Sequence, residues 1–171
     1  IKAAMDRVVE RTMLMDMTWD WPCGVAYYGI SRAYEASGDE RYLALMKERV
    51  DEYIELGLPA WTVNACAMGH SMLTLYEATQ EQKYLEIALS KIDYLRHRAL
   101  RFGDNVLQHT VSPKNDFPEQ AWADTLFMAA FFMLRVGVKQ NDRDLINDAL
   151  NQYQWHIKYL QDPSSGLWYH G

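Results

Sequence analysis

Hydrophobic and polar residues along the chain divide it into helical segments of two kinds. The first kind is apolar almost all round and rich in Ala, Gly, Met and Phe, and it covers residues 23–37, 62–79 and 119–138. Helices of this composition are covered on every side in a folded protein. The second kind has one apolar stripe at helical spacing, with charged residues elsewhere, and it covers residues 39–55, 81–98 and 142–160. The pattern predicts an inner and an outer layer of helices.

An internal repeat pairs each inner segment with the outer segment that follows it. The sequences YEAS at residues 34–37 and RYL at 41–43 recur as YEAT at 76–79 and KYL at 83–85, an offset of 42 residues. A weaker third copy runs through residues 141–146. Each copy predicts a helix, a short polar turn and a second helix.

Three such pairs, preceded by a helix near residues 1–14, indicate an all-α protein. Rings with an inner and an outer layer of helices, the (α/α)6 toroids or barrels, usually need about six pairs at this period. We therefore expect residues 1–171 to form a single domain that covers about the N-terminal half of such a ring, as a fragment truncated on its C-terminal side. Its open apolar surface would favour self-association.

The alternative architecture is an open solenoid of the tetratricopeptide kind, a helical-repeat binding module without catalysis. Tetratricopeptide repeats are about 34 residues long, which is shorter than the offset here. The inner segments are also too apolar to line an open groove.

The net charge of the chain and the length of its apolar runs bear on which partners it can bind. The chain carries 17 Lys and Arg against 23 Asp and Glu, a net charge of −6, whereas nucleic acids are bound by clustered basic residues. The longest apolar run, residues 126–134, is about half of what a membrane span requires. We expect neither nucleic acid nor a membrane as a partner.

Cysteine and histidine spacing gives no sign of a metal site. Cys23 and Cys66 are predicted to be small buried apolar residues. The five histidines show no paired-ligand spacing, so we expect no metal and no cofactor. His109 and His170 lie in connections next to inner helices, where a site at the helix starts would draw ligands, whereas His97 and His156 lie on outer helices and are assigned to the fold.

Polar residues stand at equivalent repeat positions where the inner helices begin. These positions hold Asp20, Asn64 and Asp124, and tryptophans lie close to them in sequence, among them Trp19, Trp21 and Trp122. Helix starts of one layer share a rim, and flat indole rings suit the apolar face of a sugar. The sequence predicts a concave sugar site with aromatic walls.

Asp124 has two interpretations, which predict opposite shifts of its pKa. A carboxylate at the head of an apolar helix is costly to bury, and desolvation would raise its pKa toward the range of a general acid and base. A carboxylate that caps the helix instead bonds free backbone N–H groups, which lowers its pKa. The residues alone leave both open.

Three stretches together resemble glycoside hydrolase family 105. They are the Trp-x-Asp-Thr-Leu-Phe-Met-Ala motif at 122–129, the Tyr-Glu-Ala repeats and the segment Gly-Leu-Trp-Tyr-His-Gly at 166–171. That family comprises the unsaturated rhamnogalacturonyl hydrolases, which are related to the family 88 unsaturated glucuronyl hydrolases. The resemblance implies that the chain corresponds to the N-terminal half of the family's six-pair barrel.

The resemblance also implies roles for individual residues. Asp124 matches the catalytic Asp that protonates C4 of a 4,5-unsaturated uronate and activates the water that attacks C5. Trp122 matches the neighbouring tryptophan, while His170 and His109 match two histidines of the family's site. Asn64 stands where the family commonly has a second Asp, and an Asn cannot accept a proton as a base does.

The leading hypothesis is a bacterial cytoplasmic glycosidase. It would remove a 4,5-unsaturated uronate from small, lyase-generated oligosaccharides, with Asp124 and Asn64 in catalysis. Trp122, His109, His170, Trp19 and Trp21 would bind the substrate. The fragment alone would be weak or inactive, and the competing hypothesis is a helical-repeat module that binds without turnover.

Overall fold

The computed structural model describes residues 1–59 and 61–171. Within them lie seven α-helices, two short helical turns of other types and one two-stranded hairpin. Their bounds are α1 Lys2–Met13, α2 Trp21–Ser37, α3 Glu40–Leu56, the 3-10 helix η1 Asn64–Met68, α4 Gly69–Thr79, α5 Gln82–His97, β1 Arg101–Phe102, β2 Val106–Leu107, the π-helix η2 Leu126–Phe131, α6 Phe132–Gln140 and α7 Arg143–Leu160.

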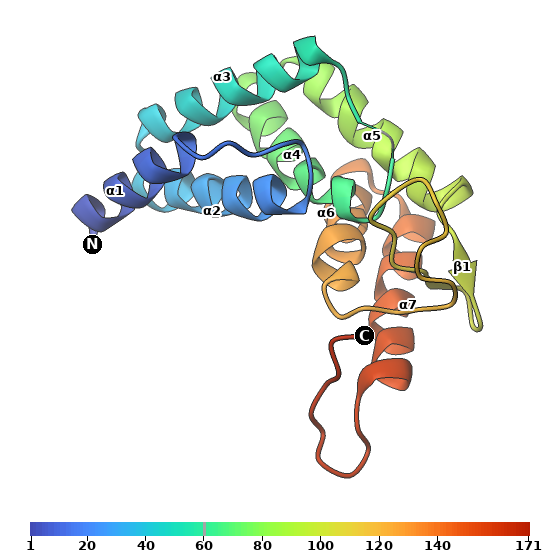
Figure 1. Ribbon diagram of the computed structural model, residues 1–171. Helices are drawn as coiled ribbons and strands as arrows, with labels where there is room; N and C mark the ends of the chain where they lie inside the picture. The colour runs from blue at the N-terminus through green and yellow to red at the C-terminus, as the bar shows by residue number, and fades with distance from the viewer. Residues whose placement is uncertain (60) are drawn as a thin grey trace.

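The helices follow a bent arc in two layers (Figure 1). Helices α3 and α5 lie on the outside of the bend, and α2 and α4 lie inside it. Each inner helix packs against the outer helix that follows it, α2 on α3, α4 on α5 and α6 on α7, and α2 also packs on α4. The predicted helical pairs are confirmed.

The repeated turn has one physical device in all three copies. The inner helices end at Gly38, Gln80 and Asn141, each in the left-handed conformation with φ of 66°, 61° and 53°. This conformation ends a helix and reverses the chain. An acidic residue follows each time, and the carboxylates of Asp39 and Asp142 accept a backbone N–H from the first turn of the next helix.

The third inner helix begins later than the predicted residue 119. Residues 119–124 lie outside any helix, and Glu119 has a φ of 56°. The first hydrogen bond of the α-helical type, from residue i+4 back to residue i, ends on the Asp124 carbonyl. The hairpin of β1 and β2, which pairs Arg101 with Leu107, was not predicted either. Both features belong to the long connection between α5 and η2.

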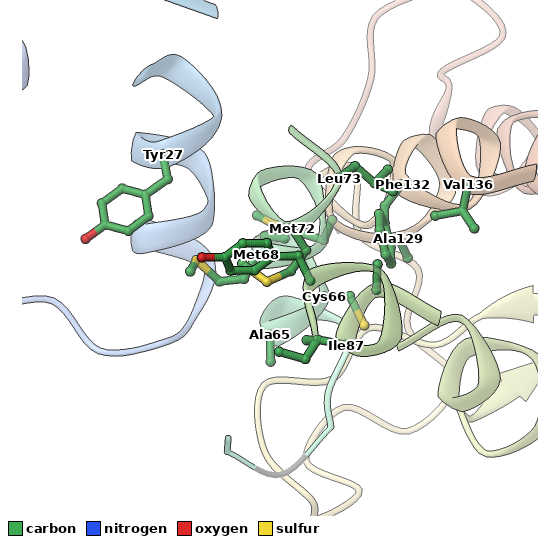
Figure 2. Packing of buried hydrophobic residues seen from close by; sticks show 14 of the residues in the cluster. Tyr27, Ala65, Cys66, Met68, Met72, Leu73, Ile87, Ala129, Phe132 and Val136 are labelled. Carbon is green, nitrogen blue, oxygen red and sulfur yellow. The ribbon is translucent and has the colours of Figure 1, made fainter. Parts of the chain in front are cut away.

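Small residues let the inner layer close up. A Cβ added to Gly24 of α2 would lie 2.4 Å from the Cβ of Ala67, and one added to Gly69 would lie 2.4 Å from the Phe132 ring. Figure 2 shows Met68 and Met72 between Tyr27 on one side and Phe132 on the other.

The two cysteines lie within this packing. Both Cys23 and Cys66 are buried free thiols, as predicted, and burial raises the pKa of each to about 11. Across the described ranges, the helices lack the combined length and apolarity of a bilayer span.

Candidate functional site

Asp124 stands at the start of η2 with a carboxylate that does not cap the helix. Its backbone carbonyl accepts the N–H groups of Phe127 at 3.0 Å and Met128 at 2.9 Å. Its side chain is 32% exposed, and Oδ1 is buried without a hydrogen-bond partner in the described part of the chain. The fold thus positions this residue through its backbone and leaves the carboxylate without a structural hydrogen bond in the described part of the chain.

His109 lies against that carboxylate. Its Nδ1 is 2.9 Å from Thr125 Oγ1 and 3.5 Å from Asp124 Oδ1, and the second distance is too long for a good hydrogen bond. Burial lowers the pKa of His109 against the opposing pull of the Asp124 carboxylate. The imidazole is therefore neutral near pH 7.

Trp122 forms an aromatic wall over His109. The two rings are parallel within 2° with centroids 4.3 Å apart, and Phe117 lies 4.9 Å from the indole centroid. The indole Nε1 donates to Gln120 Oε1 at 3.0 Å, which fixes the ring in this orientation. Trp122 and His109 thus hold each other beside Asp124.

The C-terminal segment brings His170 to the same place. The Ala123 N–H donates to the His170 carbonyl at 2.7 Å, and the two rings of Trp122 and His170 have centroids 5.3 Å apart. A Cβ added to Gly171 would lie 2.9 Å from the indole of Trp122. The exposed His170 therefore sits at the open side of the aromatic wall.

Asn64 reaches the same rim through the segment that carries His109. Its N–H donates to the Thr110 carbonyl at 3.2 Å, and the Val63 N–H donates to Thr110 Oγ1 at 2.9 Å. The Asn64 side chain is buried, and its Oδ1 makes no hydrogen bond to any described residue. Residues 109 and 110 thus connect the start of η1 to the start of η2.

The two tryptophans before α2 differ from each other. Trp19 is only 6% exposed and packs edge-on against Tyr53, with centroids 6.1 Å apart. It lines a cavity of about 590 Å³ between the rim loops and α3, together with Asp20, Thr62 and others. Trp21, the first residue of α2, is exposed. Trp21 thus has free indole surface, whereas most of Trp19 belongs to the core.

His156, which its place on an outer helix assigns to the fold, is also a neighbour of the site. It is fully buried, its Nδ1 lies 2.7 Å from the Gln152 carbonyl, and its Nε2 has no partner in the described ranges. Burial lowers the pKa of His156, while the Gln152 carbonyl and the Asp124 charge act to raise it. Its inward direction follows from the stripe of buried residues on α7: Leu145, Ala149, Gln152, His156 and Leu160.

His70 is a further buried histidine, in the first turn of α4, and its ring faces η2. Its Nε2 lies 3.0 Å from the Phe127 carbonyl, and Arg135 Nη1 lies 3.2 Å from Nδ1. Burial lowers the pKa of His70 to about 3. This neutral histidine links the second inner helix to the π-helical turn that follows Asp124.

The site combines the Asp124 carboxylate, which caps no helix, with the neutral imidazole of His109 and the aromatic wall of Trp122. A carboxyl group placed so can donate a proton and take one back, and the indole can cover the face of a sugar. No group of three or more His, Cys, Asp or Glu side chains suited to a metal ion occurs in residues 1–59 and 61–171.

Relatives of the chain are glycoside hydrolases. The model of glycosyl hydrolase family 88 matches residues 1–171. The unsaturated rhamnogalacturonyl hydrolase YesR of Bacillus subtilis (strain 168) is 47% identical over 171 residues, which cover 99% of this chain and 50% of YesR. The chain thus spans about half the length of this curated relative.

Solved structures share the fold over a similar share of their length. A possible GH105 member from Klebsiella pneumoniae is 27% identical with a TM-score of 0.83, covering 89% of this chain and 40% of that chain. Another from Salmonella enterica has a TM-score of 0.91 at 23% identity, covering 99% and 50%. The fold class and the family resemblance predicted from the sequence are both confirmed, and the chain belongs to glycosyl hydrolase family 88.

Proposed function

We propose that the protein is a glycosidase that removes a 4,5-unsaturated uronate from oligosaccharides produced by rhamnogalacturonan lyases. The observation that carries the proposal is the Asp124 carboxylate, whose buried Oδ1 has no partner in the described chain and lies beside the stacked His109 and Trp122. The relative YesR is an unsaturated rhamnogalacturonyl hydrolase, which supports the choice of substrate.

In the proposed reaction Asp124 acts in turn as acid and base. Its protonated form gives a proton to C4 of the C4=C5 double bond, which is part of a vinyl ether. The resulting carboxylate takes a proton from a water molecule, whose oxygen bonds to C5. The hemiketal at C5 then opens: its bond to the ring oxygen breaks, the hydroxyl proton passes to that oxygen, and a C5 ketone and a C1 hemiacetal result. The hemiacetal collapses to an aldehyde at C1 and releases the linked sugar as an alcohol, so the net reaction adds one water and regenerates the acid.

The neighbours of Asp124 have supporting roles in this proposal. Neutral His109 holds the aromatic wall through its stacking on Trp122. Trp122 and the exposed Trp21 cover sugar faces, and His170 contacts the substrate at the open side. Asn64 orients the water or a sugar hydroxyl through its amide, because it cannot exchange a proton as Asp124 does.

We place this enzyme in the cytoplasm, because both cysteines are free thiols and secreted domains more often use theirs in disulfides. We also propose that the 171 residues supply one side of the site and turn over substrate weakly by themselves. This is consistent with their coverage of half of YesR.

The test is an assay of the intact gene product on an unsaturated rhamnogalacturonan disaccharide. Hydration of the C4=C5 bond abolishes its near-ultraviolet absorbance, so we expect the absorbance to fall while free rhamnose appears. The saturated disaccharide is the matched control and should stay intact. Binding of the unsaturated sugar with no loss of absorbance would refute the proposal and favour a binding module.

A further inference from the structure

Lys91 is a fully buried lysine on the outer helix α5. Its Nζ lies 4.2 Å from the centroid of the Trp61 ring and 5.2 Å from that of Trp19. It donates one hydrogen bond, to the Ala65 carbonyl at 3.0 Å. No carboxylate forms an ion pair with it in the described residues.

A buried ammonium in such a place needs compensation from its surroundings. Two indole faces and one carbonyl supply it, since indole is the ring that attracts a cation most strongly. Burial lowers the pKa of Lys91 to about 8, so the group is still largely protonated at pH 7. Trp19, Trp61 and the Ala65 carbonyl thus form a cage around the Lys91 ammonium. Through this cage a buried charge clamps α5 to the segments before α2 and η1.

The carbonyl held by Lys91 belongs to the residue that follows Asn64. In the 3-10 helix η1, the Ala65 N–H donates to Thr62 Oγ1 at 3.0 Å, and the Asn64 N–H donates to the Thr110 carbonyl at 3.2 Å. Lys91 closes this set of bonds from the outer layer. The backbone on both sides of the Asn64 side chain is thus fixed by buried polar contacts.

We propose that Lys91 is a positioning residue of the active site, whose ammonium, clamped between Trp19 and Trp61, holds the start of η1 and thereby sets the direction of Asn64. The inference rests on the proposed function in that it names the part of the site through which Lys91 acts. Lys91 itself touches no substrate, because it is fully buried behind the two indoles.

The test is a double-mutant cycle in the intact gene product. Lys91→Met keeps the length of the side chain and removes the charge and the donor, and we expect kcat to fall about tenfold with KM changed less than about twofold, the size of effect of one lost hydrogen bond to a charged group. In an Asn64→Ala background the same change should cost less than about threefold, because the group that Lys91 positions is gone.

A matched control is Lys139→Met. The Lys139 ammonium also lies over an aromatic ring, 5.0 Å from the centroid of Tyr76, but it pairs with Glu77 on the surface. We expect kcat to stay unchanged. Trp61→Leu opens the cage with Lys91 in place and should lower kcat in the same direction, which keeps the test available if Lys91→Met does not fold.

Amide hydrogen exchange tests the clamp without any assay of activity. We expect the η1 amides to exchange at least about tenfold faster in Lys91→Met or Trp61→Leu, while the α7 amides keep their rates. Faster exchange with no cleavage by the wild type would retain the clamp and refute the proposed function. Unchanged η1 exchange, an unchanged kcat in an active enzyme, or fully additive effects of Lys91→Met and Asn64→Ala would overturn the inference.

Discussion

At the scale of the residue, the site depends on which polar atoms the fold leaves unpaired. The carboxylates of Asp39 and Asp142 cap the helices that follow them, whereas the carboxylate of Asp124, at a comparable helix start, caps none. The sequence placed Asp124 at the head of an apolar helix but left both interpretations open, because capping depends on a rotamer that tertiary contacts decide. Here the His109 ring, whose Nδ1 is bonded to Thr125 Oγ1, lies 3.5 Å from Asp124 Oδ1.

Trp122 gives a prediction that separates binding from chemistry. Trp122→Ala removes the ring stacked on His109, and we expect KM to rise about tenfold, since an aromatic face contributes about 1 kcal/mol beyond its buried area. Steady-state kinetics of the intact gene product measure this.

The control for Trp122→Ala is Trp155→Ala. Trp155 is a half-buried indole that packs on a small cluster of buried apolar residues, Val106, Ala121 and Leu160. Its loss should lower stability and leave KM unchanged. An equal rise in KM for both variants would show that Trp122 acts only through the fold.

At the scale of the element, the repeat was readable and the connections were not. The helices of the inner layer end at Gly38, Gln80 and Asn141, whose backbones have the left-handed conformation. The short polar turns that these residues begin are visible in the sequence, so the three helical pairs could be predicted. The composition of residues 119–124 predicts helix, but the structure has a turn there. Bonds from the His109 N–H to the Gln120 carbonyl and from the Ala123 N–H to the His170 carbonyl override that local preference, and single-sequence reasoning does not see them. The position of His156 on the buried stripe of α7 predicts that it points inward, but not that it lies near Asp124, because that depends on how α7 packs.

His70, which joins α4 to η2, gives a prediction about acid stability. Its pKa is about 3 in the folded chain and about 6.5 when unfolded, so the unfolded chain binds an extra proton between these values. Stability from this group is present above about pH 6.5 and is lost progressively toward pH 3, by on the order of 4 kcal/mol.

His70→Gln offers an acceptor and a donor for the same partners but does not titrate. We expect its free energy of unfolding, measured by denaturant titration, to fall less steeply than that of the wild type between pH 6.5 and pH 3. Because the carboxylates that lose stability in acid are common to both proteins, the difference between the two curves isolates His70. Identical slopes would show that His70 is protonated in the folded chain.

At the scale of the whole molecule, the chain is an arc whose two ends present apolar surface. A groove of about 570 Å³ between α1 and α2 is lined by apolar residues, among them Met5, Val8 and Val25. Val8 is 65% exposed, as is Val138 of α6. Exposed apolar surface of this extent favours association.

We therefore expect the 171-residue chain to self-associate at tens of micromolar, a concentration at which weak apolar interfaces are populated. Sedimentation velocity should show dimers or larger species, and Val8→Glu combined with Val25→Glu should shift them toward monomer. Leu100→Glu, a change at an exposed site before β1, is the control and should leave the distribution unchanged. A wild-type monomer that binds no apolar dye would contradict this.

The central claim is that Asp124 carries the acid and base steps, and one comparison tests it most directly. The rate of absorbance loss from the unsaturated disaccharide is measured for the intact gene product, for Asp124→Asn and for Asp116→Asn, an exposed carboxylate of the preceding loop that bonds Ser112. We predict that Asp124→Asn lowers kcat by about a thousandfold or more with an unchanged thermal midpoint, and that Asp116→Asn stays within about twofold of the wild type. Activity of Asp124→Asn within about tenfold of the wild type would contradict the account.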